Sequence, residues 1–222
     1  MSRWRDKLVP SALAVHGVEL LTDRLLRVRL ARPAHVALAP GTHIAVRSEP
    51  GSSPFGTWRR YTISAATAES VELIAYLHGD GPGTRLLRSL RVGDSLSVRA
   101  SDPPLDVPPR SAPVIITDES GIGTVVALLP LVGAATRIIV HVKDAADAAP
   151  LTALTDEAPT VIATPAIERA PVLAALAARS GVPLVVVVGQ RDTVRDVRRW
   201  ARERSTAVVH RTYWAPGRTG LE

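Results

Sequence analysis

The sequence contains no cysteine, and this absence removes several kinds of chemistry. Disulfide bonds, thiol nucleophiles, thiolate zinc sites and cysteine-ligated iron-sulfur clusters are all excluded. Histidine is also scarce. The six histidines are scattered without a ligand spacing such as His-x-x-x-His, so no protein-bound metal is expected. Any redox chemistry in this protein must therefore depend on an organic cofactor.

Long apolar runs are absent as well. No run reaches the eighteen or more residues that a membrane-spanning helix needs. The segment from Met1 to Lys7 is charged, and no apolar signal region follows it. We therefore expect a soluble, cytoplasmic protein without a membrane span.

Lysine is nearly missing from a basic chain. Of 27 basic residues only Lys7 and Lys143 are lysine, and the formal net charge is +6. This charge favours an anionic partner such as nucleic acid, a phosphate-rich cofactor or an anionic chelate, although an arginine bias is also typical of a GC-rich genome. Aromatic residues make up only 4% of the chain, and no basic run is interleaved with them. We therefore do not expect nucleic-acid binding.

The first half of the chain has the pattern of a small antiparallel β-barrel. Short apolar segments alternate with turn signals such as Pro40-Gly41 and Gly93-Asp94. About six strands at this spacing predict a barrel. The strands that we can bound are 25–30, 42–47, 58–64, 70–77 and 95–99, with a short helix at 84–90.

A proline-rich segment separates this half from the next. Residues 101–109 contain four prolines, which neither a strand interior nor a helix tolerates. Beyond it, apolar strands alternate with helices, which predicts an α/β domain with a mostly parallel sheet. The expected strands are 113–117, 137–142, 160–163, 184–188 and 207–211, and the expected helices are 124–132, 170–179 and 194–204. We expect a barrel domain at 1–100, a linker at 101–110 and an α/β domain at 111–222.

The run from Arg59 to Ser64 indicates a flavin site on the barrel. Residues two apart in a strand share a face, so Arg59 and Tyr61 point the same way and Arg60 faces away. The guanidinium can bind a pyrophosphate, the phenol can cover an isoalloxazine ring, and the Thr62 hydroxyl can bond near the reacting ring nitrogen. The alternative is a strand with a solvent-facing arginine pair and a core tyrosine.

A glycine-rich run from His78 to Arg85 is the second candidate anchor. Its glycines allow close backbone approach to a ligand, and Thr84 is expected to cap a short helix whose free N–H groups would face an anion. Such runs are also found as ordinary turns. Taken with the first run, however, it offers the two neighbouring anchors that the ring and the pyrophosphate of one dinucleotide need.

These motifs resemble the siderophore-interacting proteins, which are flavin-dependent ferric-siderophore reductases of the ferredoxin-reductase superfamily. The resemblance rests on four segments, namely 59–62, 78–82, 117–120 and 213–219. It implies that the barrel holds FAD, that the second domain meets NADH or NADPH, and that a basic surface receives the ferric chelate. The chain differs from the family pattern at Thr117, at Gly83-Thr84 and at Ser120, and Ala215-Pro216 stands where the family commonly has arginines.

The second domain opens with a turn between a strand and a helix, where a dinucleotide phosphate usually lies. This turn, Asp118 to Thr124, has only two glycines, so the full Gly-x-Gly-x-x-Gly fingerprint is missing. Some twenty residues further on stands Asp144. An acid there commonly bonds the ribose hydroxyls of NADH and repels a 2'-phosphate, although an ordinary loop aspartate is equally consistent with the pattern.

Three further features are open to two interpretations. Gly189-Gln190-Arg191 ends a strand where a nicotinamide cofactor could lie, and the arginine stripe that follows is more often a solvated helix face. Tyr213 and Trp214 are either core residues or, by the resemblance, an aromatic cover near the flavin. His78 is the one histidine that could touch the flavin. The complete set of candidate cofactor contacts is Arg59, Tyr61, Thr62, Ser64, His78, Gly79, Gly81, Pro82, Gly83, Thr84, Asp118, Ser120, Gly121, Asp144, Tyr213 and Trp214.

The function that we predict is NAD(P)H-dependent and FAD-dependent reduction of a ferric siderophore with release of Fe(II). The cofactor would perform the chemistry, so no side-chain nucleophile is needed. The alternatives are electron transfer to a protein partner and a biosynthetic or other non-redox flavin-binding role, which the altered C-terminal segment motivates. The choice between NADH and NADPH, the siderophore and the oligomeric state do not follow from the sequence.

Overall fold

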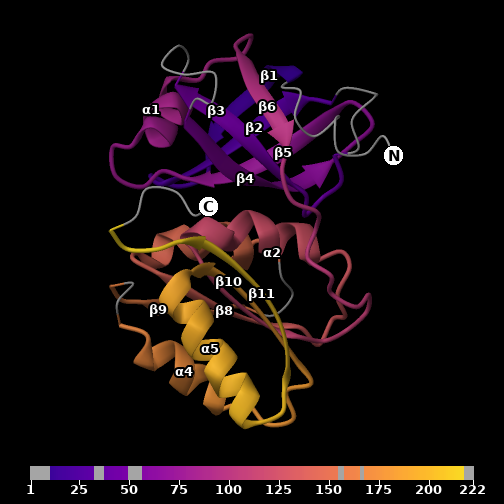
Figure 1. The fold of residues 1–222 in the computed structure, drawn as a ribbon, viewed down its shortest axis with the longest axis vertical. Coiled ribbons are helices and arrows are strands. Elements are labelled where there is room, and N and C mark those ends of the chain that lie inside the picture. Colours follow the sequence, from indigo (N-terminus) through magenta and orange to yellow (C-terminus); the bar gives the residue numbers. More distant parts are fainter. Residues whose placement is uncertain (1–10, 33–37, 50–56, 155–157, 166–167, 218–222) are drawn as a thin grey trace. The chain divides into compact units, whose positions relative to one another are not determined.

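The computed structural model describes residues 11–32, 38–49, 57–154, 158–165 and 168–217. The chain divides into two compact units, Met1–Pro104 and Leu105–Glu222. The first is a closed antiparallel barrel and the second is a parallel sheet covered by helices (Figure 1), which confirms the predicted fold class. Two segments of the sequence analysis, the N-terminal 1–7 and the motif residues 218–219, lie outside the described part of the chain.

The barrel is built from six strands in the order β1-β2-β5-β4-β3-β6, closed by pairing of β1 with β6. Its inward positions follow the period of two that the sequence shows. In β2, for example, Leu26, Val28 and Leu30 are buried in one core with residues of the other strands. The strands are β1 (Ser11–Leu20), β2 (Leu25–Ala31), β3 (His43–Glu49), β4 (Thr57–Ala66), β5 (Ser70–Tyr76) and β6 (Ser95–Ala100), and helix α1 (Pro82–Ser89) lies between β5 and β6.

The second unit has a five-stranded parallel sheet in the order β11-β10-β7-β8-β9. The order reverses between β7 and β10, and ligands of open α/β sheets bind outside the carboxyl ends of the strands at such a point. The strands are β7 (Val114–Asp118), β8 (Arg137–Val142), β9 (Thr160–Ala163), β10 (Leu184–Gln190) and β11 (Ala207–Trp214).

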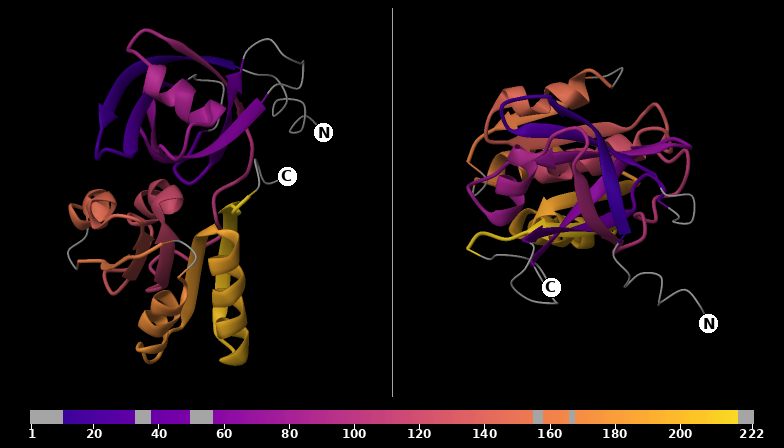
Figure 2. Two further views of the ribbon diagram at one scale, coloured as in Figure 1. Left: turned by 90° about the vertical axis from the view of Figure 1, so that its left-hand side faces the viewer. Right: turned by 90° about the horizontal axis from the view of Figure 1, so that it is seen from above.

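Helices cover both faces of this sheet, as Figure 2 shows. Residues of α4 and α5, among them Leu176 and Val197, form one core with Ile116 and Val187 of the sheet, while α2 and α3 lie on the opposite face. β10 is buried along its whole length, which its run of apolar residues predicted. The helical segments are η1 (Glu119–Gly121), α2 (Ile122–Leu128), η2 (Ala145–Ala148), α3 (Ala149–Thr152), α4 (Ala170–Ala177) and α5 (Arg191–Glu203).

Several helix boundaries differ from the expected ones, and two of the differences have a clear physical reason. The helix predicted at 124–132 ends at Leu128, because Pro130 has no N–H to donate to the carbonyl oxygen four residues before it. The helix predicted at 194–204 begins at Arg191, since the side chain of Gln190 accepts the Thr193 N–H and caps it. Glutamine is not a usual capping residue, so no capping pattern indicated that start.

Candidate functional site

The first turn of α1 lies against Arg59 and Tyr61 of β4. The helix begins at Pro82 after Gly81, which is extended and provides no side-chain cap. A Cβ atom on Gly83 would lie 2.9 Å from the Tyr61 hydroxyl and 3.0 Å from Cγ of Arg59, which is closer than ordinary packing allows. Arg59 and Tyr61 therefore lie on the same side of β4, and only glycine leaves space between them and the helix.

Thr84 does not cap this helix, contrary to the expectation from the sequence. The helix starts two residues earlier, because the fixed φ of Pro82 suits the first helical position and its missing N–H is no loss there. The Thr84 hydroxyl instead donates to the carbonyl oxygen of His78 at 2.8 Å and closes the turn. Within the turn Gly79 has φ +58°, and the ring of His78 stacks on Tyr76.

The donors at this turn suit a diphosphate. The N–H of Arg85 bonds the carbonyl oxygen of Gly81, whereas the N–H groups of Gly83 and Thr84 belong to the first turn, which has no intrahelical acceptors. The stem of the Arg59 side chain thus lies beside the positive end of the helix, and its Nη1 donates to the carbonyl oxygen of Trp58 at 3.1 Å. The arrangement fits the pyrophosphate of FAD, since two backbone N–H groups without intrahelical acceptors lie beside the side chain of Arg59.

Tyr61 is neutral in this environment. Burial raises the pKa of Tyr61 to about 12, and the nearby charge of Arg59 opposes that shift only in part. The side chain also packs against the barrel core. A neutral, half-buried phenol beside a cation suits contact with a ring system.

Thr62 has a partner that the sequence analysis missed. Its hydroxyl lies 3.0 Å from Nε2 of His43, which is directly opposite on β3. No pattern in the sequence marks His43, and only the strand pairing shows its relation to Thr62. Ser64, the last residue of the run, donates its hydroxyl to the carbonyl oxygen of Glu72 and so takes part in the barrel wall.

In the second unit the carboxylate of Asp118 joins the ends of three strands. One oxygen accepts the N–H and the hydroxyl of Ser120, and the other accepts the N–H of Gln190 at 2.7 Å and Nε1–H of Trp214 at 2.9 Å. Burial raises the pKa of Asp118, and the donors from Ser120, Trp214 and Gln190 oppose this shift. The carboxylate thus fastens β10 and β11 to the end of β7.

Gly189 makes that arrangement possible. Its φ is +123°, and a Cβ atom there would overlap the Asp118 carboxylate. The sequence pattern Gly189-Gln190 is therefore explained by the close approach of Asp118 to the backbone of β10.

Gln190 leaves one polar group for a ligand. Its side-chain oxygen accepts both the N–H and the hydroxyl of Thr193, so its Nε2 must point the other way. Gln190 is 2% exposed, and Nε2 has no hydrogen-bond partner among the described residues. This orphaned amide lies at the carboxyl edge where the strand order reverses, so the site fits the carbonyl or another acceptor of a bound dinucleotide.

The acidic residues near β8 have local roles. Glu119 is buried and accepts the N–H of Lys143 at 2.6 Å, and burial raises its pKa. Asp144 is exposed and accepts the N–H of Ala146, which caps the short helix η2. Its position after β8 is the one that we expected, and its carboxylate is accessible to solvent.

Tyr213 bonds a different element from the one that Trp214 bonds. Its hydroxyl lies 2.6 Å from the hydroxyl of Thr124 in α2. The two aromatic residues at the end of β11 therefore bond different elements, Tyr213 to α2 and Trp214 to β7. Ala215, the next residue, is buried.

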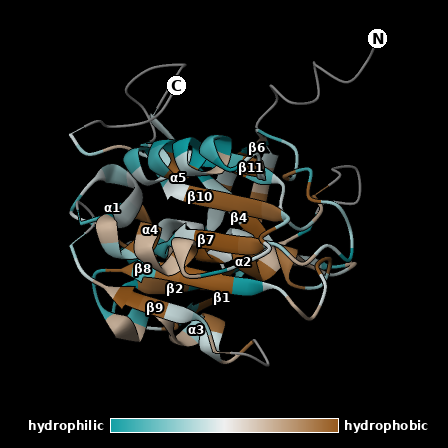
Figure 3. Ribbon diagram, turned by 90° about the horizontal axis from the view of Figure 1, so that it is seen from below, coloured by the Kyte–Doolittle hydropathy of each residue, from teal (hydrophilic) through white to brown (hydrophobic). Residues whose placement is uncertain are grey.

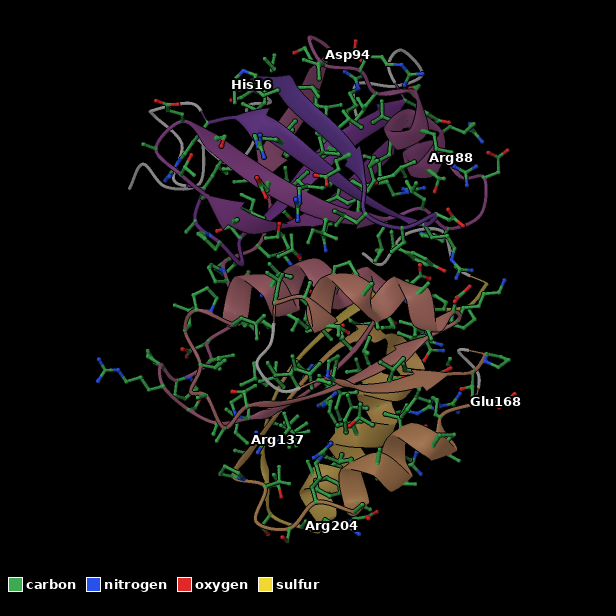
Figure 4. The ribbon with its side chains drawn as sticks, turned by 180° about the vertical axis from the view of Figure 1, so that it is seen from behind. His16, Arg88, Asp94, Arg137, Glu168 and Arg204 are labelled. Atoms are coloured by element: carbon green, nitrogen blue, oxygen red, sulfur yellow. The ribbon has the colours of Figure 1, made fainter. Side chains whose placement is uncertain are left out.

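The arginine stripe of α5 is a solvated, ion-paired face. Asp192 pairs with Arg195, and Asp196 pairs with Arg169, Arg195 and Arg199. The helix is largely hydrophilic in Figure 3, and Arg204 after its end lies on the outside of the unit in Figure 4. We find no group of three or more possible metal ligands within the described residues, and no helix there is both long and apolar enough to cross a membrane.

Comparison with known families supports a flavin-binding barrel. Residues 19–103 match the oxidoreductase FAD-binding domain. This match covers the strands and the α1 turn that form the cradle of Arg59, Tyr61 and Gly83. Comparison with curated proteins finds no match.

Solved structures share the fold over nearly the whole chain. A siderophore-interacting protein from Acinetobacter baumannii is 14% identical with a TM-score of 0.78, covering 96% of this chain and 93% of that one. A siderophore-interacting protein from Aeromonas hydrophila is 21% identical with a TM-score of 0.75, covering 93% and 98%. A ferredoxin NADP+ reductase from Neisseria gonorrhoeae, solved with FAD and NADP, is 16% identical with a TM-score of 0.70, covering 92% and 99%. The chain therefore has the ferredoxin-reductase-like fold, and the resemblance seen in the sequence is confirmed for the fold.

Proposed function

We propose that this protein is an FAD-dependent oxidoreductase that takes hydride from NADH or NADPH and reduces a ferric siderophore, so that Fe(II) is released. The observation that supports the flavin is the cradle at Gly83, where a helix N-terminus, the stem of the Arg59 side chain and the Tyr61 phenol meet without space for a Cβ atom. The match of this barrel to the oxidoreductase FAD-binding domain supports the same cofactor.

Each side chain of the cradle has a distinct part in this proposal. Arg59 and the N–H groups of Gly83 and Thr84 neutralise the pyrophosphate, and Tyr61 packs on the ring system. Thr62 provides a hydroxyl for the edge of the ring. When bound, FAD supplies the conversion of one two-electron transfer into two one-electron transfers.

The second unit would bind the nicotinamide cofactor at its sheet edge. The unpartnered Nε2 of Gln190 is the group that supports a polar ligand there. Asp144 would bond the ribose hydroxyls, and its charge favours NADH over NADPH. Asp118 already binds Ser120, Gln190 and Trp214, so we assign it to holding the edge together and to positioning the indole of Trp214.

The ferric chelate is the acceptor that the siderophore-interacting neighbours support. A basic chain with a net charge of +6 suits an anionic chelate, and the absence of cysteine excludes an iron-sulfur relay on this chain. Siderophore chelators hold Fe(II) far less tightly than Fe(III), so reduction itself releases the metal.

The test is anaerobic reduction followed by addition of one acceptor at a time. The FAD-loaded protein should bleach with NADH or NADPH, and a ferric siderophore should restore the oxidised spectrum without any added protein. Restoration only by a protein acceptor would replace the chelate with an electron-transfer partner. Failure of both nicotinamides to bleach the flavin would indicate a non-redox role.

A further inference from the structure

A row of three polar side chains crosses the barrel wall at Thr62. His43 on β3 lies directly opposite Thr62 on β4, and its Nε2 is 3.0 Å from the Thr62 hydroxyl. On the other side of β3 lies the segment that follows β6. In this segment Oδ2 of Asp102 is 4.0 Å from Nδ1 of His43. The ladder fixes this register, because the N–H of His43 donates to the carbonyl oxygen of Asp102 and the N–H of Ser101 donates to that of His43.

The row runs from a buried hydroxyl to an accessible carboxylate. Thr62 and His43 are 6% and 3% exposed, whereas the side chain of Asp102 is 39% exposed. An imidazole with one nitrogen at a buried hydroxyl and the other toward an exposed acid is arranged to carry a proton. Packing alone does not require such a residue in the barrel wall, since an apolar side chain would fill the same space.

We propose that Thr62, His43 and Asp102 form a relay that removes one proton from the flavin site to solvent. This inference rests on the proposed function, because it assigns Thr62 to the reacting edge of the flavin. In this relay Thr62 touches the cofactor, and His43 and Asp102 act through it.

The proton follows from the balance of the proposed reaction. A hydride brings two electrons and one proton to the flavin, and two ferric chelates each take one electron. One proton is left at the flavin and must leave for the oxidised ring to return. As the Thr62 oxygen receives it, the Thr62 hydroxyl proton passes to Nε2 of neutral His43, and the resulting imidazolium loses a proton to water beside Asp102.

Charged groups on the neighbouring strands set how readily His43 becomes an imidazolium. The Asp102 carboxylate favours it, while Arg60 on β4, whose Nε is 3.8 Å from the same carboxylate oxygen, partly offsets that charge. The hydroxyl of Ser101 also donates to Asp102 at 2.8 Å. The other basic side chains on these strands are Arg47 on β3, Arg59 on β4 and Arg99 on β6, and Arg99 lies over the ring of Trp58.

The first experiment needs no flavin. NMR titration of the imidazole of His43, assigned with His43→Gln, should show its midpoint moving to lower pH by about one unit in Asp102→Asn. The exposed Asp106→Asn removes the same charge four residues away and should leave the midpoint unchanged. Equal midpoints in wild type and Asp102→Asn would overturn the coupling on which the relay depends.

The second experiment follows oxidation of the chemically reduced, FAD-loaded protein by ferricyanide, which needs neither nicotinamide nor siderophore. His43→Gln keeps a polar side chain but transfers no proton, so oxidation should slow by at least about tenfold with FAD affinity within about twofold of wild type. Thr62→Val should slow it similarly, Thr62→Ser should restore it, and the solvent deuterium isotope effect of the wild type should vanish in His43→Gln.

The outcomes separate the two claims. If the FAD-loaded His43→Gln variant keeps the oxidation rate and the isotope effect of the wild type, the relay is overturned while the proposed function stands. If the wild-type protein binds no FAD, the proposed function is overturned, and the relay then has no flavin from which to remove a proton.

Discussion

The indole N–H of Trp214 donates to the carboxylate of Asp118 at 2.9 Å, across 96 positions of the sequence. The same carboxylate oxygen accepts the N–H of Gln190 at 2.7 Å, so one buried charge connects the ends of β7, β10 and β11. This carboxylate lies at the strand-order reversal of the sheet, which is the edge where dinucleotides bind in this class of fold. The position of Trp214 thus depends on a residue that the sequence analysis predicted to be a direct cofactor contact.

Removing the indole donor should weaken the second unit measurably. Trp214→Phe keeps the aromatic ring and deletes one hydrogen bond to a buried charge, so we expect a loss of about 1–3 kcal/mol in the free energy of unfolding. Urea unfolding of the wild type, Trp214→Phe, Asp118→Asn and the double variant measures the coupling of the pair. Additive effects of the two substitutions would show that the hydrogen bond contributes nothing specific.

Asp118 should also leave a signature in the pH dependence of stability. Burial raises its pKa above the ordinary value of 3.8, so the folded protein holds this proton more tightly than the unfolded chain does. Its contribution to stability is therefore greatest below the ordinary pKa and declines as pH rises from there through the raised value. The unfolding free energy of the wild type, taken relative to that of Asp118→Asn, should therefore fall as pH rises. A relative value that grows with rising pH would contradict the assignment.

Gly83 should be intolerant of even one added methyl group. Gly83→Ala places a Cβ atom against the Tyr61 hydroxyl and Arg59, so FAD affinity should fall by at least about tenfold while helix propensity favours the alanine. Gly17→Ala in β1 is the matched control, because its Cβ would meet only an ordinary contact at 3.5 Å. Flavin fluorescence titration compares the two variants, and equal affinities would remove the cradle from the proposal.

The charge of Asp144 should decide between the two nicotinamides. Asp144→Ser removes the carboxylate but retains a side-chain oxygen that can still cap η2, so the local structure is preserved. We expect the ratio of kcat/KM for NADPH to that for NADH to rise by about tenfold. An unaltered ratio, with both substrates still used, would show that the ribose lies elsewhere.

Local patterns in the sequence were sufficient to predict the fold. Alternating apolar residues gave the barrel strands, apolar runs gave the parallel sheet, and the turn at Gly93-Asp94 is present with φ +96° at Gly93 and the Asp94 carboxylate bonded to the N–H of Arg91 (Figure 4). These features depend on residues that are close in sequence, so the spacing of apolar and turn-forming residues along the chain reveals them.

The interactions that were missed join residues distant in sequence. His43 lies opposite Thr62 only because β3 and β4 pair in one register, and Asp118 meets Trp214 only once the sheet order is known. Thr84 was misjudged for a local reason, because Pro82 starts the helix earlier than a capping threonine would. A sequence supplies candidate side chains for a site, but their partners are set by strand register and topology.

The most direct test of the central claim is FAD titration of three forms of the protein. Wild type should bind one FAD per chain, Arg59→Ala should lose affinity by at least about tenfold, and Arg60→Ala should stay within about twofold of wild type. The two variants remove the same charge from adjacent positions, and only Arg59 flanks Gly83. A wild-type protein that binds no FAD, or equal losses in Arg59→Ala and Arg60→Ala, would contradict a flavin site at this cradle.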